Sequence, residues 1–521
     1  MTTTPQTPRG RAIFIGAGPG DPGLLTTRGL RVLADADVVV YDRAVAHMLR
    51  LARPDAERIE VGAPAEGNMA QDAIAMLVAD KVREGCLVAR LKWGDPFLFG
   101  SGAKEALFLH EQGLPFEVVP GVPIALGGAY AGVPISYPGG HDALVLLRGH
   151  EHTGESAPNV RWPALASLDG TVATYATGRQ AAEVLRKLVA GGRAVTHTAA
   201  LIYDATLASQ RTLTGTLGEL ADQLEAEGAD STPALLIVGD VTGLRAHLRW
   251  FDERPLFGRR IVVTRSRERA RDLSDQIESL GGQALEAQTF RLIPADDPEA
   301  IERTVATVQQ FQWVVCESAN AAHRFLKALL TGTRDLRALG GVKVAAVGPS
   351  TADQLRMAGL VPDVIVPEIG EEATCQALAA HGPLAESRVL VIRPEHGRAE
   401  DPRDGLAGAL RARGVDVQDL VAYRTVASAP ESAASQELYR QLLDGSIDAV
   451  TFASPTAVER FADLIGREQA ADLLNTTVVV TMGPVTAAAA EAIGVTAPIV
   501  AQTFTVDGLV EALVHALKTP A

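Results

Sequence analysis

The 521-residue chain has few cysteines, few aromatic residues and no long apolar run. Its three cysteines, Cys86, Cys316 and Cys375, are scattered, which suits a reducing cytoplasm and leaves open that one of them is reactive. No clustered His/Cys pattern predicts a metal site. Aromatic residues make up only 5% of the chain, and the net charge of −15 argues against binding to nucleic acids or anionic membranes. No apolar run is long enough to cross a bilayer.

Length and composition favour several α/β domains. The chain exceeds one ordinary domain, and we expect three or four. Its hydrophobic content of 47% is ample for aliphatic cores. In the first half, short apolar runs alternate with amphipathic segments, which predicts a mostly parallel sheet flanked by helices. These runs are 12–15, 38–40, 58–61, 87–91 and 116–119, and a second α/β unit is predicted from 143–147 to 234–238.

The second half states one pattern twice. An apolar run leading to Ser318 and a helical segment is matched by a run leading to Ser454. A Gly-Pro-x-Thr segment begins thirty residues after the first serine and twenty-nine after the second, at Gly348 and Gly483. Repeated strand–cap–helix units predict two similar lobes with a cleft between them. Hydroxyls and free backbone N–H groups at four helix starts would suit carboxylates there.

A glycine-rich turn, Gly16 to Pro22, follows the first predicted strand. The turn approaches the dinucleotide-binding fingerprint, but Asp21 stands where the third glycine is expected, which disfavours an NAD site. Two interpretations stay open. The turn is either a tight strand–helix connection and no more, or a rigid loop that lets a ligand approach the backbone closely.

Together with further segments, this turn resembles the tetrapyrrole methylase family, and uroporphyrinogen-III C-methyltransferases in particular. The segments are 38–43 (VVVYDR), 91–100 (LKWGDPFLFG), 118–134 (VVPGVPIALGGAYAGVP), 214–217 and 233–239. The resemblance implies a cleft between two α/β units that binds S-adenosylmethionine, with a porphyrinogen nearby. It also implies a homodimer formed through this half.

The resemblance assigns roles to individual residues. Asp42 corresponds to the family's proposed proton acceptor. Methylation of a pyrrole carbon needs a ring held in line with the sulfonium methyl, and a group that then accepts the ring proton. The family's cofactor contacts fall on Pro19, Trp93, Gly94, Asp95, Leu98, Pro123, Ile124, Thr177 and Ala205.

Four positions depart from the family pattern. Ala63 stands where the family has a lysine proposed as proton donor, and Trp93 stands where it has a glycine. Tyr137 replaces a histidine, and Thr177 replaces a methionine that contacts the cofactor. An alternative therefore stays open, in which the first half is a degenerate scaffold or product-binding module and only the second half is catalytic.

The ordered motifs of the second half resemble uroporphyrinogen-III synthase over residues 260–517. The resemblance implies closure of hydroxymethylbilane to uroporphyrinogen III with ring D inverted, without a metal or organic cofactor. The product of such a synthase is the substrate of such a methylase. The whole chain would then deliver precorrin-2, on the way to siroheme or cobalamin.

Tyr423 corresponds to the synthase family's candidate proton donor to the leaving hydroxyl. A hinge tyrosine that only packs between lobes is the alternative interpretation. The substrate is a polycarboxylate, and each contact with a helix N-terminus would contribute on the order of 1 kcal/mol. The residues expected to bind it are Ser318, Thr351, Ser454, Thr456 and Thr486, with Arg265 and Arg393 at equivalent strand ends. Surface solvation is the alternative for the two arginines.

The predicted fold class is α/β, with a two-subdomain methylase fold followed by a bilobal, internally duplicated synthase fold. We expect a loose tail rather than a secretory signal at 1–10. The predicted divisions are 11–248 (units 11–138 and 143–245), a linker at 249–258, and 259–518 (outer lobe 259–292 and 428–518, inserted lobe 295–424).

Three classes of function follow. The first is a cytoplasmic two-step enzyme, synthase and methyltransferase. The second keeps only the synthase. The third is a non-enzymatic bilobal binder similar to a solute receptor. For all three the expected partners are small molecules, not nucleic acid or membrane.

Overall fold

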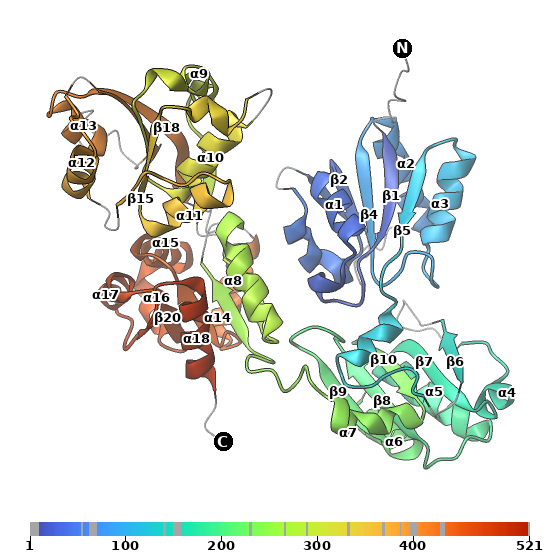
Figure 1. Ribbon diagram of the computed structural model, residues 1–521. Helices are drawn as coiled ribbons and strands as arrows, with labels where there is room; N and C mark the ends of the chain where they lie inside the picture. The colour runs from blue at the N-terminus through green and yellow to red at the C-terminus, as the bar shows by residue number, and fades with distance from the viewer. Residues whose placement is uncertain are drawn as a thin grey trace.

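The computed structural model describes most of the chain. The described part forms four α/β units, each built on one sheet (Figure 1). The described residues are 10–53, 56–61, 70–138, 142–148, 158–228, 232–264, 267–287, 290–297, 299–330, 334–366, 370–385, 387–395, 405–427 and 433–518. The predicted α/β class is confirmed.

The first sheet is entirely parallel, in the order β3-β2-β4-β1-β5. Alternate residues of its central strands enter different cores, because helices cover both faces: Ile13 and Ile15 face one, Ala12 and Phe14 the other. One predicted strand, 58–61, lies one residue earlier. The strands are β1 (Arg11–Gly16), β2 (Val38–Tyr41), β3 (Glu57–Glu60), β4 (Leu87–Lys92) and β5 (Phe116–Val119). The helices are η1 (Pro22–Leu24), α1 (Thr27–Asp35), η2 (Arg43–Leu51), α2 (Gln71–Arg83) and α3 (Gly102–Glu111).

The second sheet has the order β6-β7-β10-β8-β9, and only its β6–β7 pair is parallel. Its helices α5 and α6 each begin with a capping box, at Thr177 and Thr216. The strands are β6 (Ala143–Leu147), β7 (Gly170–Thr177), β8 (Thr198–Tyr203), β9 (Arg211–Thr216) and β10 (Pro233–Val238). The helices are η3 (Ile124–Ala129), α4 (Trp162–Ala166), α5 (Gly178–Ala190), α6 (Leu217–Ala226), η4 (Asp240–Leu244) and α7 (Arg245–Leu248).

The predicted linker, 249–258, packs against both halves of the chain. The Trp250 indole donates to the Ala129 carbonyl oxygen at 3.0 Å, and its ring lies 5.0 Å from that of Tyr130. At the other end, Leu256 is fully buried, and its N–H donates to the Leu280 carbonyl oxygen at 3.0 Å. The segment is therefore an ordered connection between the halves.

The third sheet is parallel, in the order β12-β11-β19-β20-β21. The chain leaves it after β12 and returns at β19, having formed the fourth sheet in between, which Figure 1 shows in yellow and orange. Its strands are β11 (Arg260–Val263), β12 (Gln283–Glu286), β19 (Ala449–Phe452), β20 (Val478–Thr481) and β21 (Ile499–Val500). Its helices are α8 (Arg267–Ser279), α14 (Ala433–Leu443), α15 (Pro455–Ile465), α16 (Arg467–Leu474), α17 (Pro484–Ala492) and α18 (Val506–Leu517).

The fourth sheet has the order β13-β18-β17-β14-β15-β16, and only its β13–β18 pair is antiparallel. Its strands are β13 (Phe290–Pro294), β14 (Trp313–Cys316), β15 (Lys343–Val347), β16 (Val364–Val366), β17 (Arg388–Glu395) and β18 (Asp416–Ala427). Its helices are α9 (Ala300–Ala306), η5 (Val308–Gln310), α10 (Ala319–Leu329), η6 (Leu336–Leu339), α11 (Pro349–Met357), α12 (Glu371–Ala379) and α13 (Gly405–Arg411).

The two crossings between these lobes are strands, where the sequence predicts short connecting stretches. Phe290 pairs with Ala427 and Pro294 with Tyr423, so β13 and the end of β18 form an antiparallel ribbon. Two segments that run in opposite directions can satisfy each other's backbone groups in this way. Tyr423 consequently lies in a sheet and not in a loop.

The predicted duplication is confirmed in detail. Ser318 and Ser454 adopt nearly the same backbone angles, with φ of −151° and −157°, and each caps an eleven-residue helix after a four-residue strand. The following units, β15–α11 and β20–α17, both end in nine-residue helices that begin with proline.

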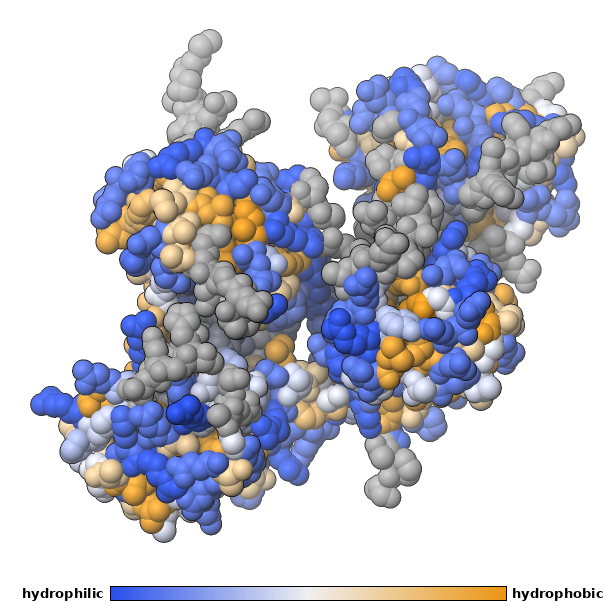
Figure 2. Space-filling model, turned by 180° about the vertical axis from the view of Figure 1, so that it is seen from behind, coloured by the Kyte–Doolittle hydropathy of each residue, from blue (hydrophilic) through white to orange (hydrophobic). Residues whose placement is uncertain are grey.

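The face of the molecule shown in Figure 2 carries mostly hydrophilic residues, with hydrophobic ones in separate patches. Exposed hydrophobic side chains of the first half include Phe97, Leu98 and Phe99, which are 49%, 37% and 45% exposed. Within the described part of the chain, every helix is too short or too polar to cross a membrane.

Candidate functional site

The glycine-rich turn is fastened to the segment that follows β4. Gly18 and Gly94 exchange backbone hydrogen bonds of 3.2 and 2.9 Å across an isolated bridge. Gly94 has a φ of 65°, and a Cβ there would lie only 2.9 Å from the Ile124 side chain. Glycine is needed at this position for both reasons. The bridge places Pro19 beside Gly94 and Ile124.

Trp93 connects the two units of the first half. Its indole Nε1 donates to the Pro19 carbonyl oxygen at 2.8 Å, and its ring lies 4.2 Å from that of Tyr175, edge to face. Tyr175 and Thr177 lie on the same face of β7, because strand residues alternate. The Thr177 hydroxyl is buried, where it caps α5 by accepting from the Gln180 N–H at 3.4 Å.

Asp95 organises the backbone around this point. Its carboxylate accepts from the Gly121 N–H at 2.9 Å and from the Phe97 N–H at 2.9 Å. A Cβ at Gly121 would lie 2.3 Å from the Gly94 carbonyl oxygen, so the two segments touch through their backbones. Pro123 follows at once as the N-cap of η3.

The loop after β8 completes this cluster from the second unit. The Asp21 N–H donates to the Thr206 hydroxyl at 2.9 Å, and a Cβ at Gly127 would lie 3.2 Å from the Cβ of Ala205. Asp204 and Thr206 have positive φ values of 47° and 79°. Such strain in residues other than glycine persists where the surroundings impose it, and it gathers at ligand sites.

Five of the predicted cofactor residues are therefore brought together: Pro19, Trp93, Gly94, Ile124 and Ala205. Leu98 lies at the exposed end of the Asp95 turn. The sequence reasoning missed Thr206 and the Tyr130 hydroxyl, which donates to Asp21 at 2.5 Å. Asp21, at the place of the missing third glycine, was the available signal.

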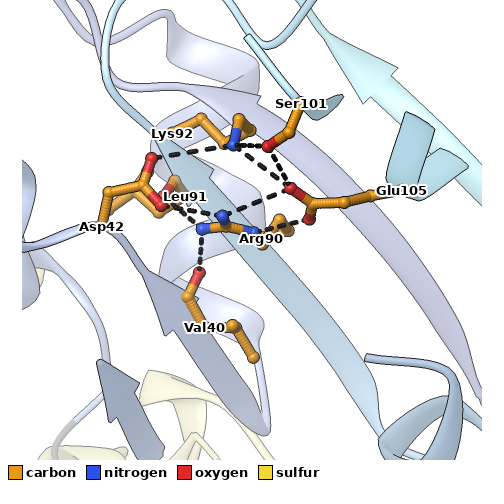
Figure 3. Close-up of polar contacts among 7 residues, drawn as sticks. All are labelled: Val40, Asp42, Arg90, Leu91, Lys92, Ser101 and Glu105. Atoms are coloured by element: carbon orange, nitrogen blue, oxygen red, sulfur yellow. Dashed lines mark hydrogen bonds and ion pairs between the residues drawn. The ribbon is translucent and has the colours of Figure 1, made fainter. Parts of the chain in front are cut away.

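Asp42 stands at the edge of a buried ionic cluster (Figure 3). It follows β2 and precedes η2, but its carboxylate does not cap that helix. Instead, Asp42 Oδ1 pairs with Arg90 Nη2 at 2.7 Å, and Asp42 Oδ2 lies 3.8 Å from Lys92 Nζ. Sequence reasoning missed Arg90 and Lys92, although two cations in an otherwise apolar strand were a visible signal.

In the second half, the structure joins Tyr423 to Ser318. The Tyr423 hydroxyl lies 3.1 Å from Ser318 Oγ, which also caps α10 by accepting from the Ala321 N–H at 3.2 Å. The tyrosine is buried, 5% exposed, and the Arg324 guanidinium lies 5.6 Å from its ring centre. Sequence reasoning missed Arg324.

The neighbouring Cys316 is no candidate nucleophile, because burial raises the pKa of its thiol to about 12.

The remaining predicted contacts lie at strand ends in both lobes. Strand β14 pairs with β15, and β19 pairs with β20, so their carboxyl ends and the helix starts that follow meet at one sheet edge in each lobe. Thr351 and Thr486 are buried behind these starts, whereas Ser454 and Thr456 are exposed.

Of the remaining residues singled out from the sequence, the structure describes Arg393 and Tyr137 but not Arg265 and Ala63. Arg393 pairs with Asp419 on the neighbouring strand, with Nε to Oδ1 at 2.8 Å, so its charge is already compensated. Arg265 and Ala63 lie outside the described residues. Tyr137 is 53% exposed, so it is not part of a hydrophobic core.

Comparisons with known proteins divide the chain as the fold does. The family described as Tetrapyrrole (Corrin/Porphyrin) Methylases matches residues 11–221, and Uroporphyrinogen-III synthase HemD matches residues 271–511. The porphyrin biosynthesis protein HemD of Ruminiclostridium josui is 30% identical over 87% of this chain and 88% of that protein. The uroporphyrinogen-III C-methyltransferase of Bacillus subtilis is 32% identical over 69% of this chain and 74% of that protein. A crystal structure of uroporphyrin III C-methyl transferase from Thermus thermophilus, 33% identical, covers 45% of this chain and 100% of that one, with a TM-score of 0.39.

The two folded halves thus define a bifunctional enzyme class of tetrapyrrole biosynthesis, in which a methylase region precedes a synthase region. The chain belongs to the family of porphyrin biosynthesis proteins to which the Ruminiclostridium josui protein belongs. The predicted recognition of both halves and the prediction of an enzyme are confirmed.

Proposed function

We propose that the chain performs two successive steps on one tetrapyrrole in the cytoplasm. The second half closes hydroxymethylbilane to uroporphyrinogen III with inversion of ring D. The first half then transfers methyl groups to uroporphyrinogen III and yields precorrin-2. Family membership supports the order of steps, because the product of the one region is the substrate of the other.

The observation that carries the synthase proposal is the contact between Tyr423 and Ser318 at a capped helix start. The hydroxyl of the linear substrate departs as water, and ring D is attacked at its substituted carbon to give a spiro intermediate that reopens and closes the other way round. The pyrrole electrons drive these steps, so the protein folds the chain and positions ring D. Tyr423 would donate a proton to the leaving hydroxyl, with Ser318 fixing its phenol at 3.1 Å. No metal or organic cofactor is proposed for this half.

Helix starts would bind the carboxylates of the substrate. Exposed Ser454 and Thr456 would contact them through hydroxyls, and the buried Thr351 and Thr486 would shape the backbone N–H groups around them. Arg265 and Arg393 stay proposed contacts, although Arg393 would first have to exchange its bond with Asp419.

For methyl transfer, Pro19, Gly94, Ile124 and Ala205 would hold S-adenosylmethionine, with Asp95, Leu98, Pro123 and Thr177 around it. The close backbone approach at Gly18 and Gly94 supports this, because a ligand can contact peptide groups where no side chain intervenes. Bound there, the cofactor would supply an electrophilic methyl group. Asp42 would accept the proton that the ring system loses.

The proposed domain limits are those predicted from the sequence, with the inserted lobe running between the two crossings. The exposed side chains of Phe97, Leu98 and Phe99 support a homodimer through the first half, because a second copy would remove them from water.

A specific observation favours the alternative, a synthase with a methylase-like half that no longer transfers methyl groups. The Trp93 indole fills space beside Pro19 and bonds its carbonyl oxygen at 2.8 Å, among the residues proposed for the cofactor. In this version the first half would bind the synthase product or serve as a scaffold.

One incubation tests both versions. The whole protein is given hydroxymethylbilane with and without S-adenosylmethionine, and products are analysed by isomer and mass. We expect uroporphyrinogen III without the cofactor and a doubly methylated product with it. Formation of the I isomer alone would refute the synthase, and an unmethylated III isomer would favour the alternative.

A further inference from the structure

In the ionic cluster around Asp42, the charged side chains other than that of Asp42 are buried (Figure 3). The side chains of Arg90, Glu105 and Lys92 are 1%, 2% and 8% exposed, whereas that of Asp42 is 28% exposed. Two cations and two anions make the cluster neutral when all four are ionised. Asp42 is therefore the member through which the cluster meets solvent or a ligand.

Glu105 binds both cations on the buried side. Arg90 donates to it from Nε at 2.8 Å and from Nη2 at 3.4 Å, and Lys92 Nζ donates at 3.2 Å. Lys92 also donates to the Ser101 hydroxyl at 2.9 Å, and Ser101 in turn donates to Glu105 at 2.7 Å. Burial alone would raise the pKa of Glu105, but Arg90 and Lys92 overcome it and lower the pKa to about 2.

Lys92 is not needed to neutralise Glu105 alone. Arg90 already gives that carboxylate two hydrogen bonds, and burying a second cation costs several kcal/mol in desolvation. Lys92 adds a positive charge beside Asp42, because its Nζ lies 3.8 Å from Asp42 Oδ2, whereas Arg90 pairs with Asp42 Oδ1. Since the Asp42 carboxylate makes no cap to η2, its two oxygens face one cation each.

We propose that Lys92 is a positioning residue of the methyl-transfer site, which together with Arg90 holds the Asp42 carboxylate in the orientation that accepts the proton of the methylated ring. The inference rests on the proposed methyl transfer. There, the carbon–sulfur bond of the sulfonium breaks toward sulfur, a pyrrole carbon forms the new bond to the methyl carbon, and a C–H bond of the ring system gives its proton to Asp42. Accepting that proton leaves the cluster with one excess positive charge, which favours rapid release of the proton to solvent from Asp42.

Other charged groups near Asp42 balance one another. Arg43, the next residue, pairs with Glu60 of β3 at 3.5 Å. Burial, with Glu60 adding to it, raises the pKa of Tyr41, which keeps its phenol neutral. On η2, burial lowers the pKa of His47, whose ring bonds the Gly20 carbonyl oxygen at 2.6 Å. Among the described residues, Arg90 and Lys92 are thus the cations that act on Asp42. The other anion that both of them contact is Glu105.

The test compares Lys92→Met and Lys92→Arg in the full chain. Methyl transfer from labelled S-adenosylmethionine to uroporphyrinogen III is measured in single turnovers at neutral pH, and binding of S-adenosylhomocysteine is measured by calorimetry. We expect Lys92→Met to lower the rate about 10- to 100-fold at neutral pH, with cofactor affinity changed less than about threefold. Lys92→Arg should restore most of the rate.

Lys81→Met is the matched control, because it removes a lysine from α2 that pairs with Glu57 at 2.8 Å, away from the cluster. A second measurement does not depend on activity: Asp42→Asn, Lys92→Met and the double variant form a cycle for hydrogen exchange in β4. The Asp42→Asn change should destabilise β4 less when Lys92 is absent.

An unchanged single-turnover rate in Lys92→Met, or additive effects in the cycle, would overturn the inference while the proposed activity stands. A wild-type chain that transfers no methyl group would refute the proposed activity, and the catalytic part of the inference with it.

Discussion

The two halves of the molecule present polar groups in opposite ways. The first half buries charges on β4 and α3 and exposes one carboxylate, Asp42, at their edge. The second half presents hydroxyls and backbone N–H groups at helix starts, and pairs its described strand-end arginine, Arg393, with Asp419. A group that accepts a proton needs a fixed electrostatic environment, whereas a flexible polycarboxylate is held by many weak donors. Under the proposed function, the first half would use this arrangement for proton transfer and the second half for binding the substrate carboxylates.

Glu105→Gln should give the largest loss of stability, because it leaves two buried cations with one anion. The pKa of Glu105 falls from 4.5 to about 2 in the folded chain, which corresponds to about 3 kcal/mol at neutral pH. Since the folded-state pKa is the lower one, this stability is present above about pH 4.5 and is lost as the pH falls toward about 2. Hydrogen exchange of β4 and α3 peptides measures it.

The control for this change is Glu111→Gln at the exposed end of the same helix. It should leave the exchange of β4 as it is in the wild type. Equal effects of the two substitutions would contradict a stabilising role of the Glu105 carboxylate in the buried ionic cluster.

Tyr423→Phe should slow ring closure by the second half about tenfold, less than the loss of an indispensable acid, because the pyrrole already activates the leaving hydroxyl. Slower closure leaves time for the spontaneous reaction, so the share of the I isomer should rise. Chromatography of the isomers formed from hydroxymethylbilane checks this. Tyr439→Phe, on α14, is the matched control, and an unchanged isomer ratio in Tyr423→Phe would leave the tyrosine as a packing residue.

Ser318→Ala and Ser454→Ala separate binding from catalysis within the duplicated lobes. Each removes a helix N-cap, at a cost of about 1 kcal/mol to its own lobe. Only Ser318→Ala also removes the 3.1 Å contact with Tyr423, so it alone should lower kcat, by about two- to fivefold. Synthase kinetics read beside hydrogen exchange of α10 and α15 distinguish the two effects, and equal kcat losses would contradict the asymmetry.

The duplication could be predicted because its signals are local. An apolar run, a capping serine and a helical pattern lie within a few residues, and Ser318 and Ser454 cap their helices as that pattern requires. The parallel first sheet follows in the same way from the alternation of strands and helices. Motif order also singled out the segments around Pro19 and Gly94, which the structure joins through the backbone hydrogen bonds between Gly18 and Gly94.

What could not be predicted depends on residues far apart in the sequence. Glu105 meets Arg90 across fifteen positions, and Tyr423 pairs with Pro294 in a ribbon that reads in the sequence as a loop. Local propensity contains no information on such partners. The Thr206 contact to Asp21 spans 185 positions, and only the assembled units reveal it.

The smallest expected effect concerns Glu278, whose situation is the reverse of that of Glu105. On α8, it pairs with Arg50 of η2 at 2.5 Å, which joins the two halves, and both side chains are partly exposed, 26% and 20%. Burial raises the pKa of Glu278, and the single arginine does not overcome it. Its contribution to stability is therefore present below its ordinary pKa and is lost as the pH rises through the raised value. Glu278→Gln should change stability by less than about 1 kcal/mol at neutral pH, whereas Arg50→Gln, which leaves the partly buried carboxylate without its cation, should cost more. Hydrogen exchange of η2 and α8 in these variants, and in the charge exchange Arg50→Glu with Glu278→Arg, measures the coupling. If Glu278→Gln proved the costlier change, a single cation would suffice to stabilise a partly buried carboxylate here, and the second cation beside Glu105 would need another reason.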